Sequence, residues 1–314
     1  MSFRILVTGS SGFIGSAVVS ALVAAGHSVR AASRHPSGTA NAGKFEWVRL
    51  PDLEDEVDWE PLVAGMDIVL HLAAIAHRSH ADSSDYAKPN LVATASLAHA
   101  CHRHMIKRLI FMSSIGAQAG SAADHVVTET DEPCPITAYD RAKLEAEEEI
   151  RRSGVPFTIL RPVLVYGPGA KANIALIMRV AALPFPLPFG AFSNRRSLVS
   201  IDNLLQAIVF CLDSQTTLNR TFIVSDREPI TLADMFATLR DAAGRAPGLI
   251  SIPPVAVRAM VIATGRQALW DRIGRELVAS SAALQAAGWS PQIETKAGLR
   301  ALVRAVNNDA SRRN

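Results

Sequence analysis

Cysteine is scarce in this chain of 314 residues, and an uninterrupted hydrophobic run of membrane-spanning length is missing. The three cysteines are odd in number, lie far apart and lack the spacing of metal ligands; they are Cys101, Cys134 and Cys211. This pattern excludes a disulfide framework and predicts reduced thiols in a cytoplasmic protein. The amino terminus leads directly into an expected strand, which leaves no room for a signal peptide.

The most apolar stretch of helix length, residues 253–270, is interrupted by Arg258, Gly265 and Arg266, so we expect no membrane insertion. Because it also carries few basic residues, the sequence favours a helix that packs on its own lobe over one that lies on a membrane surface.

The chain also lacks a large excess of charge of either sign: it has 32 Lys and Arg and 29 Asp and Glu, which leave a net charge of +3. Such a small and dispersed excess argues against a nucleic-acid partner. Two groups of histidines follow the middle strands; they are His71, His77 and His80, and His99, His102 and His104. Their spacing matches no common ligand pattern, so we expect no metal site.

What the sequence does contain is a glycine turn between a short apolar run, residues 3–7, and an amphipathic helix that ends at Gly26. The turn is Thr8-Gly9-Ser10-Ser11-Gly12-Phe13-Ile14-Gly15. Glycines at these positions permit a tight reversal, a close approach of backbone to phosphate and close packing of the helix. Because a strand precedes it and a helix follows it, the turn predicts a dinucleotide site rather than a merely structural loop.

The tip of the second expected strand, residues 28–32, carries Ser33, Arg34 and His35 and no acidic residue. An acid at this tip accepts from the 2′-hydroxyl of the adenine ribose and selects NAD. A guanidinium can instead pair with a 2′-phosphate, so Arg34 favours NADP(H), with NAD(H) as the alternative. Asp52 and Leu53 follow the third strand and are expected beside the adenine.

Strands are also expected at residues 45–50, 67–71, 108–112, 156–160, 198–201 and 221–225, and Asp202 is expected to cap a helix that runs to Leu212. Small residues after the strand at 67–71, Leu72-Ala73-Ala74, allow a dinucleotide to lie across the sheet. Helices between the strands predict an α/β fold: a doubly wound parallel sheet with a smaller carboxy-terminal α/β lobe. We expect the dinucleotide-binding domain at residues 1–165, rejoined by 200–226, and the substrate lobe at 166–199 and 227–314.

A helix expected from Ile136 carries Tyr139 and Lys143, which lie four positions apart and therefore on one face. An ammonium beside a phenol is expected to lower the phenol's pKa. Such a pair also occurs on ordinary helix surfaces. The order of the motifs favours a catalytic role for this pair: the glycine turn comes first, then Ser113-Ser114 at the end of the fifth strand, and then Tyr139 and Lys143.

The glycine turn, Ser114 and Tyr139-x-x-x-Lys143 resemble the extended short-chain dehydrogenase/reductases of the NAD-dependent epimerase/dehydratase family, over nearly the whole chain. The resemblance implies a Rossmann fold, a homodimer formed through the Tyr139 helix, and Tyr139 as general acid/base on a sugar oxygen. Lys143 then tunes the tyrosine and holds the nicotinamide ribose, and Ser114 binds the sugar oxygen; a one-residue shift to Ser113 stays open.

The resemblance also implies a nucleotide-sugar site. Asn90 lies where the family has an asparagine that supports the active-site helix, and Pro162 lies in the stretch under the nicotinamide. Asn173 and Arg196 fall in segments similar to the family's clamp on the substrate diphosphate, whereas Arg195 has no assigned role.

The segment from Leu187 to Leu198 looks most like bacterial enzymes that reduce a UDP-4-keto-6-deoxy-N-acetylhexosamine for surface polysaccharide synthesis. The sequence therefore favours reduction at C4 of a UDP-hexose, with UDP-hexose 4-epimerization as the alternative. Ile115 and Gly116 after Ser114 lack the acidic pair of the family's dehydratases. A catalytically inactive NAD(P)-sensing protein is the alternative from another class, although such proteins often lose the tyrosine or the lysine.

Overall fold

The computed structural model describes residues 2–35, 45–75, 86–170, 173–265, 267, 270 and 274–313, with side chains up to 308. A seven-stranded parallel sheet has the order β11-β7-β5-β4-β1-β2-β3, which is a doubly wound Rossmann-like arrangement. Its strands are β1 (Arg4–Thr8), β2 (Ser28–Ser33), β3 (Phe45–Arg49), β4 (Ile68–His71), β5 (Arg108–Met112), β7 (Phe157–Pro162) and β11 (Arg220–Val224).

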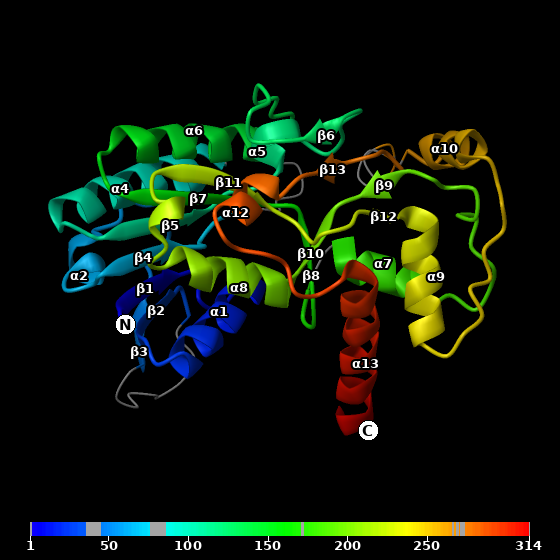
Figure 1. The fold of residues 1–314 in the computed structure, drawn as a ribbon, viewed down its shortest axis with the longest axis horizontal. Helices are drawn as coiled ribbons and strands as arrows, with labels where there is room; N and C mark the ends of the chain where they lie inside the picture. The colour runs from blue at the N-terminus through cyan, green and yellow to red at the C-terminus, as the bar shows by residue number, and fades with distance from the viewer. Residues whose placement is uncertain are drawn as a thin grey trace.

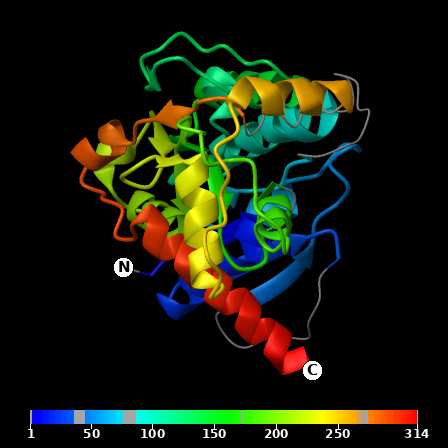
Figure 2. The ribbon, with the colours of Figure 1, turned by 90° about the vertical axis from the view of Figure 1, so that its right-hand side faces the viewer.

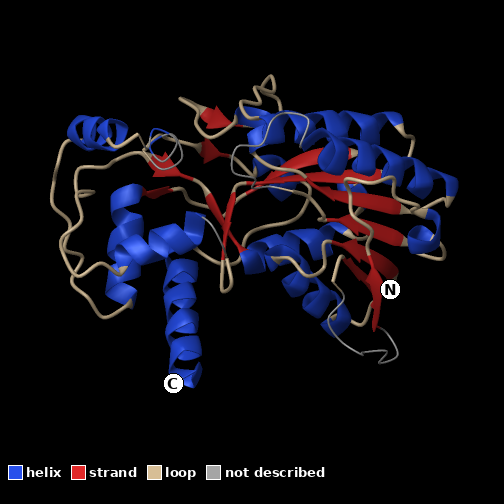
Figure 3. Cartoon of the chain, turned by 180° about the vertical axis from the view of Figure 1, so that it is seen from behind, coloured by secondary structure: helices blue, strands red, loops and turns tan. Residues whose placement is uncertain are grey.

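Helices cover both faces of this sheet, as Figure 1 and the view from behind in Figure 3 show. One face carries α1 (Phe13–Ala24), α8 (Ile201–Cys211) and α12 (Ala282–Ala286). The other carries α2 (Glu60–Val63), the π-helical turn η1 (Ala87–Val92), α4 (Ala93–Arg103) and α6 (Ala138–Arg152); α5 (Gly116–Ala119) and η2 (Gln215–Thr217) are short turns. The central strands are almost fully buried because both faces are covered, whereas the edge strand β3 is partly exposed.

The smaller lobe has its own hydrophobic core, which includes Phe192, Phe236 and Leu302. Its helices are α7 (Asn173–Ala181), α9 (Leu232–Ala242), α10 (Pro254–Ala263) and α13 (Thr295–Arg313). Three two-stranded sheets lie along the joint between the lobes: β10 (Leu198–Ser200) with β8 (Leu164–Tyr166), β12 (Ile230–Thr231) with β9 (Arg195–Arg196), and β13 (Val278–Ala279) with β6 (Val126–Val127).

The carboxylate of Asp226 joins the end of the large sheet to the smaller lobe. It accepts hydrogen bonds from Tyr166 Oη at 2.9 Å, Asn203 Nδ2 at 2.7 Å and the Ser200 N–H at 3.0 Å. Thr295 Oγ1 at the start of α13 donates to the same carboxylate at 3.3 Å. Burial raises the pKa of Asp226, and these donors satisfy its oxygens.

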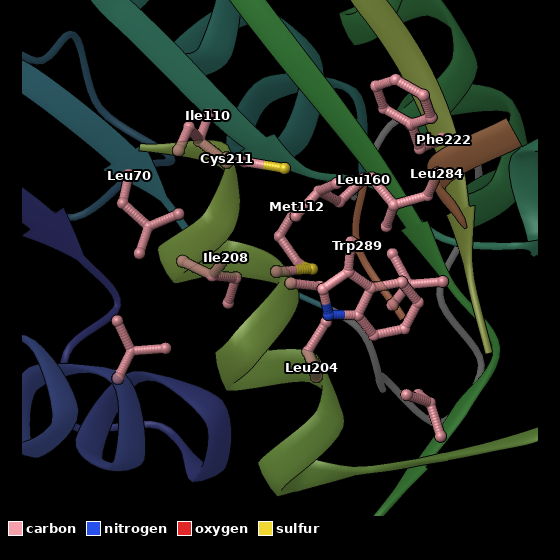
Figure 4. Close-up of a cluster of buried hydrophobic side chains, with 14 of the residues drawn as sticks. Leu70, Ile110, Met112, Leu160, Leu204, Ile208, Cys211, Phe222, Leu284 and Trp289 are labelled. Carbon is pink, nitrogen blue, oxygen red and sulfur yellow. The ribbon is translucent and has the colours of Figure 1, made fainter. Parts of the chain in front are cut away.

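The carboxy-terminal part of the chain returns to the large sheet. Leu277, Leu284 and Trp289 lie in the hydrophobic core between the sheet and α8, as the close-up in Figure 4 shows for the latter two. The sequence analysis placed residues 227–314 in the smaller lobe; those boundaries stay a prediction, but this segment packs on the large sheet because its apolar side chains cover β11.

Two local expectations need correction. Ser200, not Asp202, caps α8, since its hydroxyl accepts from the Asn203 N–H at 3.1 Å. Helix α6 begins at Ala138 rather than at Ile136. Helix α10 packs on its lobe, as expected, through Val257 and in part Val261, and its other side is exposed.

Candidate active site

The glycine turn closes between β1 and α1 in a geometry that only glycine allows at two positions. Gly9 has a φ of +70°, and a Cβ there would lie 2.7 Å from the amide nitrogen of Ala73. A Cβ on Gly15 would lie 2.1 Å from the carbonyl oxygen of Gly9. Gly12 caps α1 without a side-chain hydrogen bond, so no side chain competes with an anion for the first N–H groups of the helix.

A cavity of about 200 Å³ adjoins this turn at the carboxyl edge of the sheet. It is lined by Gly9, Ser11, Gly12, Ser33, Arg34, Leu50, Asp52, Leu53, Leu72, Ala73, Ala74 and Ile75. These include the residues that the sequence predicted for the adenosine half of a dinucleotide. Within the described part of the chain, the buried hydroxyl of Ser33 has no hydrogen-bond partner, while Arg34 beside it is exposed. Both fit the ribose end of a dinucleotide.

A larger cleft of about 900 Å³ continues from this cavity, since Leu72 and Ala74 line both. Its lining includes Ile14, Tyr86, Ser113, Ser114, Thr137, Tyr139, Lys143, Pro162, Arg196 and Leu277. The predicted catalytic residues and most of the predicted dinucleotide residues therefore line two adjoining hollows.

Helix α6 holds Tyr139 and Lys143 at this cleft. Thr137 and Asp140 form a capping box, which fixes the first turn of the helix and with it Tyr139. One turn later, Lys143 Nζ donates to the Met112 carbonyl at the end of β5 at 2.8 Å and lies 4.5 Å from the centroid of the Phe111 ring.

The two adjacent serines have different surroundings. Ser113 is buried and its hydroxyl donates to Glu147 Oε1 at 2.5 Å. Ser114 is partly exposed in the cleft, where its hydroxyl accepts from the Gly116 N–H at 3.0 Å. A hydroxyl already bonded to a carboxylate is less available to a substrate, so the geometry favours Ser114.

The expected lowering of the Tyr139 pKa is wrong for this structure. Burial, together with Asp140 and Tyr86, raises the pKa of Tyr139 above its usual value, and burial lowers the pKa of Lys143 to about 7. Both charged forms are disfavoured because the site is poorly solvated. Tyr86, which the sequence analysis missed, packs edge-on against Tyr139 with ring centroids 6.0 Å apart.

Asn90 supports the site from behind. It lies in the π-helical turn η1, and its side-chain amide bonds both the N–H and the carbonyl of Ile75 at 2.9 Å. It is not among the described residues that line the two hollows, so its geometry points to holding the loop after β4. Phe13 lines a neighbouring hollow with Pro168 and Gly169.

His71 is a structural histidine. It is fully buried between Thr8 Oγ1 at 2.7 Å and Thr94 Oγ1 at 3.1 Å, and burial lowers its pKa to about 3. His77 and His80 lie outside the described residues. Within the described ranges, no three His, Cys, Asp or Glu side chains are grouped to hold a metal ion.

Arg196 reaches the cleft from the smaller lobe. Its guanidinium donates to the carbonyls of Arg275 at 2.7 Å and Ser121 at 3.4 Å, and burial lowers its pKa to about 10. Arg195 instead pairs with Glu276 at 3.3 Å on the surface. Asn173 begins α7 but is not among the described residues that line the cleft.

Glu147, also missed, lies one turn beyond Lys143 on the same face of α6, and that spacing was its sequence signal. Its carboxylate is fully buried and binds the guanidinium of Arg161 through two contacts, Nε to Oε1 at 2.9 Å and Nη2 to Oε2 at 2.6 Å. Arg161 also donates to Gln118, and Arg151 donates to Glu147.

Replacing Glu147→Gln is expected to lower the free energy of unfolding by about 3 kcal/mol, since it leaves the Arg161 charge buried without its counterion. Urea denaturation measures the loss. The neighbouring Glu148→Gln, which removes an exposed pair with Arg152, is the control and should cost less than about 1 kcal/mol. Equal losses in the two variants would contradict a buried role for Glu147.

Residues 5–224 match the NAD dependent epimerase/dehydratase family. A UDP-glucose 4-epimerase of Vibrio cholerae is 32% identical over 97% of this chain and 96% of its own.

Solved structures share the fold at lower identity. A UDP-glucose 4-epimerase from Thermotoga maritima, determined with UDP-glucose, has a TM-score of 0.77 at 24% identity and covers 98% of this chain and 99% of its own. The Bordetella bronchiseptica enzyme WbmG, in complex with NAD, has a TM-score of 0.79 at 20% identity. The match covers 98% of this chain and 95% of the WbmG chain. The chain thus belongs to the NAD-dependent epimerase/dehydratase family and is an enzyme of the short-chain dehydrogenase/reductase type.

Proposed function

We propose that the protein transfers hydride at C4 of a nucleotide-linked hexose. The observation that carries this proposal is the meeting of Ser114, Tyr139 and Lys143 in one cleft that continues into the cavity beside the glycine turn. A bound nicotinamide supplies or accepts the hydride. The V. cholerae relative, which is named as a UDP-sugar enzyme and matches nearly the whole chain, supports a UDP-hexose substrate.

Within this proposal, each residue of the site has a separate role. The Tyr139 phenolate accepts the proton of the C4 hydroxyl when that carbon is oxidised, and the Tyr139 hydroxyl returns it to the C4 oxygen on reduction; the raised pKa of Tyr139 favours the second of these steps. The Ser114 hydroxyl binds the same oxygen and orients it. Arg196, bonded only to carbonyls within the described part of the chain, keeps its positive charge available for the substrate diphosphate.

Asn173 at the amino terminus of α7 is proposed to assist Arg196, although the described cleft does not include it. The division into residues 1–165 with 200–226 and residues 166–199 with 227–314, with the substrate between the two parts, stays part of the proposal. A homodimer through α6 also stays a prediction.

Replacing Tyr139→Phe should lower turnover by roughly 10²–10⁴ while leaving dinucleotide affinity nearly unchanged, because only the proton donor is lost. Turnover is measured with UDP-glucose by product chromatography and with UDP-4-keto-sugars by NAD(P)H absorbance, and affinity by fluorescence titration. Undiminished turnover in the variant would remove Tyr139 from the mechanism. Tight dinucleotide binding with neither reaction in the wild type would instead identify an inactive sensor.

We place 4-epimerization first and reduction of a 4-keto sugar second, the reverse of the order that the sequence favoured. The epimerase relative, aligned over 97% of the chain, supports the first, whereas the absence of an acid at Ser33-Arg34 favours the second. An epimerase re-reduces the carbon it has oxidised and keeps its dinucleotide through the cycle, but a reductase must exchange it at every turnover.

Denaturing the protein as purified and analysing the supernatant by chromatography separates these two activities. Stoichiometric NAD is the result expected of the epimerase. A protein that releases no dinucleotide and binds NADPH reversibly would replace the epimerase with the reductase.

NAD(H) is the cofactor type that the family implies, and a preference for NADP(H) is proposed on Arg34 alone. Arg34→Ala should weaken NADPH by about tenfold or more and NADH little, since a guanidinium–phosphate pair is lost. Arg4→Ala, at the opposite end of the strands, is the control for a lost surface charge. Equal weakening of both dinucleotides in Arg34→Ala would end the NADP(H) preference.

A further inference from the structure

The loop after β4 lines both hollows, so its position sets the shape of the dinucleotide site. Residues 72–75 line the smaller cavity, and Leu72 and Ala74 also line the cleft. The loop lies against the glycine turn, because a Cβ on Gly9 would lie 2.7 Å from the nitrogen and 2.9 Å from the Cα of Ala73. Whatever holds this loop therefore holds one wall of the site.

Two side chains fix the loop. Thr8 Oγ1, at the end of β1, accepts from the Ala73 N–H at 3.3 Å. The side-chain amide of Asn90 accepts from the Ile75 N–H and donates to the Ile75 carbonyl, both at 2.9 Å. Thr8 and Asn90 are almost completely buried, so little water competes with them for these bonds.

A buried chain of hydrogen bonds joins these two side chains. Thr8 Oγ1 lies 2.7 Å from Nδ1 of His71, and Nε2 of the same ring lies 3.1 Å from Thr94 Oγ1. The Thr94 hydroxyl lies 2.7 Å from the carbonyl of Asn90, one turn earlier. Thr94 reaches the ring because α4 packs over β1 and β4, as the cyan helix above the blue strands shows in Figure 1 and, from the side, in Figure 2.

The direction of every bond in this chain follows from its ends. A carbonyl only accepts, so the single proton of the Thr94 hydroxyl goes to Asn90, and the Thr94 oxygen must accept from the His71 Nε2–H. The ring is neutral because burial lowers its pKa, so Nδ1 carries no proton and accepts from the Thr8 hydroxyl. The Thr8 oxygen in turn accepts from the Ala73 N–H. The Thr94 hydroxyl therefore orients each donor as far as the loop.

We propose that Thr94 is a positioning residue for the dinucleotide, which acts through His71 and Asn90 to keep the loop at residues 72–75 where the cofactor requires it. Without the Thr94 hydroxyl, the His71 Nε2–H is buried without its acceptor, and the ring relieves this only by turning or by moving its proton to Nδ1. Either change breaks the bond from the Thr8 hydroxyl. The proposal rests on the dinucleotide site and not on the reaction at C4, so its test measures affinity.

The test is the affinity of Thr94→Val for NADH and NADPH, measured by fluorescence titration after any bound dinucleotide has been removed. We expect the Kd of both to rise about tenfold, since valine keeps the shape of the side chain but not its hydroxyl. Thr94→Ser, which keeps the hydroxyl, should restore the affinity. At saturating dinucleotide, kcat of Thr94→Val should stay within about twofold of the wild-type value, because the loss is one of binding.

Thr158→Val is the matched control. Thr158 is also a fully buried threonine whose hydroxyl donates to a carbonyl, that of Thr217 at 2.9 Å, but it lies at the amino end of β7, away from the glycine turn. It should bind both dinucleotides as the wild type does. An equal loss in Thr158→Val, unchanged affinity in Thr94→Val, or a failure of Thr94→Ser to restore binding would each overturn the proposal.

Hydrogen exchange of the wild type gives a measurement that does not depend on the folding of Thr94→Val. In the dinucleotide-free protein, the amides of Ala73 and Ile75 should exchange slowly, because both are bonded to buried acceptors. If these two amides exchange as fast as those of exposed loops, the chain of bonds through Thr94 does not hold the loop, and the proposal is wrong.

Discussion

The contact between α6 and the carboxyl end of β5 is the constraint on which the site depends. Lys143 donates to the carbonyl of Met112, and Glu147 accepts from the hydroxyl of Ser113, so two side chains one turn apart hold the last residue of β5 and the residue after it. The next residue, Ser114, is thereby directed into the cleft that Tyr139 enters from the same face of α6. The dinucleotide turn on β1 reaches the same edge because parallel strands end together there.

Burial gives this contact its electrostatic character. The same low polarity that raises the pKa of Tyr139 lowers that of Lys143 to about 7, so neither group is charged without cost. Glu147 and Arg161 avoid that cost by neutralising each other below the site. A second buried carboxylate, Asp226, joins α8, α13 and the ends of the strands through four donors, and so connects the lobe that carries Arg196 to the sheet that carries Tyr139.

Much of the fold could be predicted from local pattern. The apolar runs, the glycine turn and the amphipathic helices between them are repeated signals, and the structure confirms the doubly wound parallel sheet that they indicate. Short elements were less predictable. Helix α8 is capped by Ser200 and not by Asp202 as expected. Both residue types can cap a helix, and only the path of β10 decides between them. The packing of Leu284 and Trp289 on the large sheet depends on where the chain returns, which local sequence does not encode.

The sequence by itself determined the turn at Gly9–Gly15, the spacing of Tyr139 and Lys143, and the missing acid beside Arg34, because each depends on residue type and local spacing. Only the tertiary structure decided which of the two serine hydroxyls is bonded to a carboxylate, that Tyr86 packs on Tyr139, and that Asn90 holds a loop instead of lining a hollow. It also decided that the pKa of Tyr139 is raised and that one side of α10 is exposed. The physical reason is the same in each case: solvation and hydrogen-bond partners are set by segments distant in sequence.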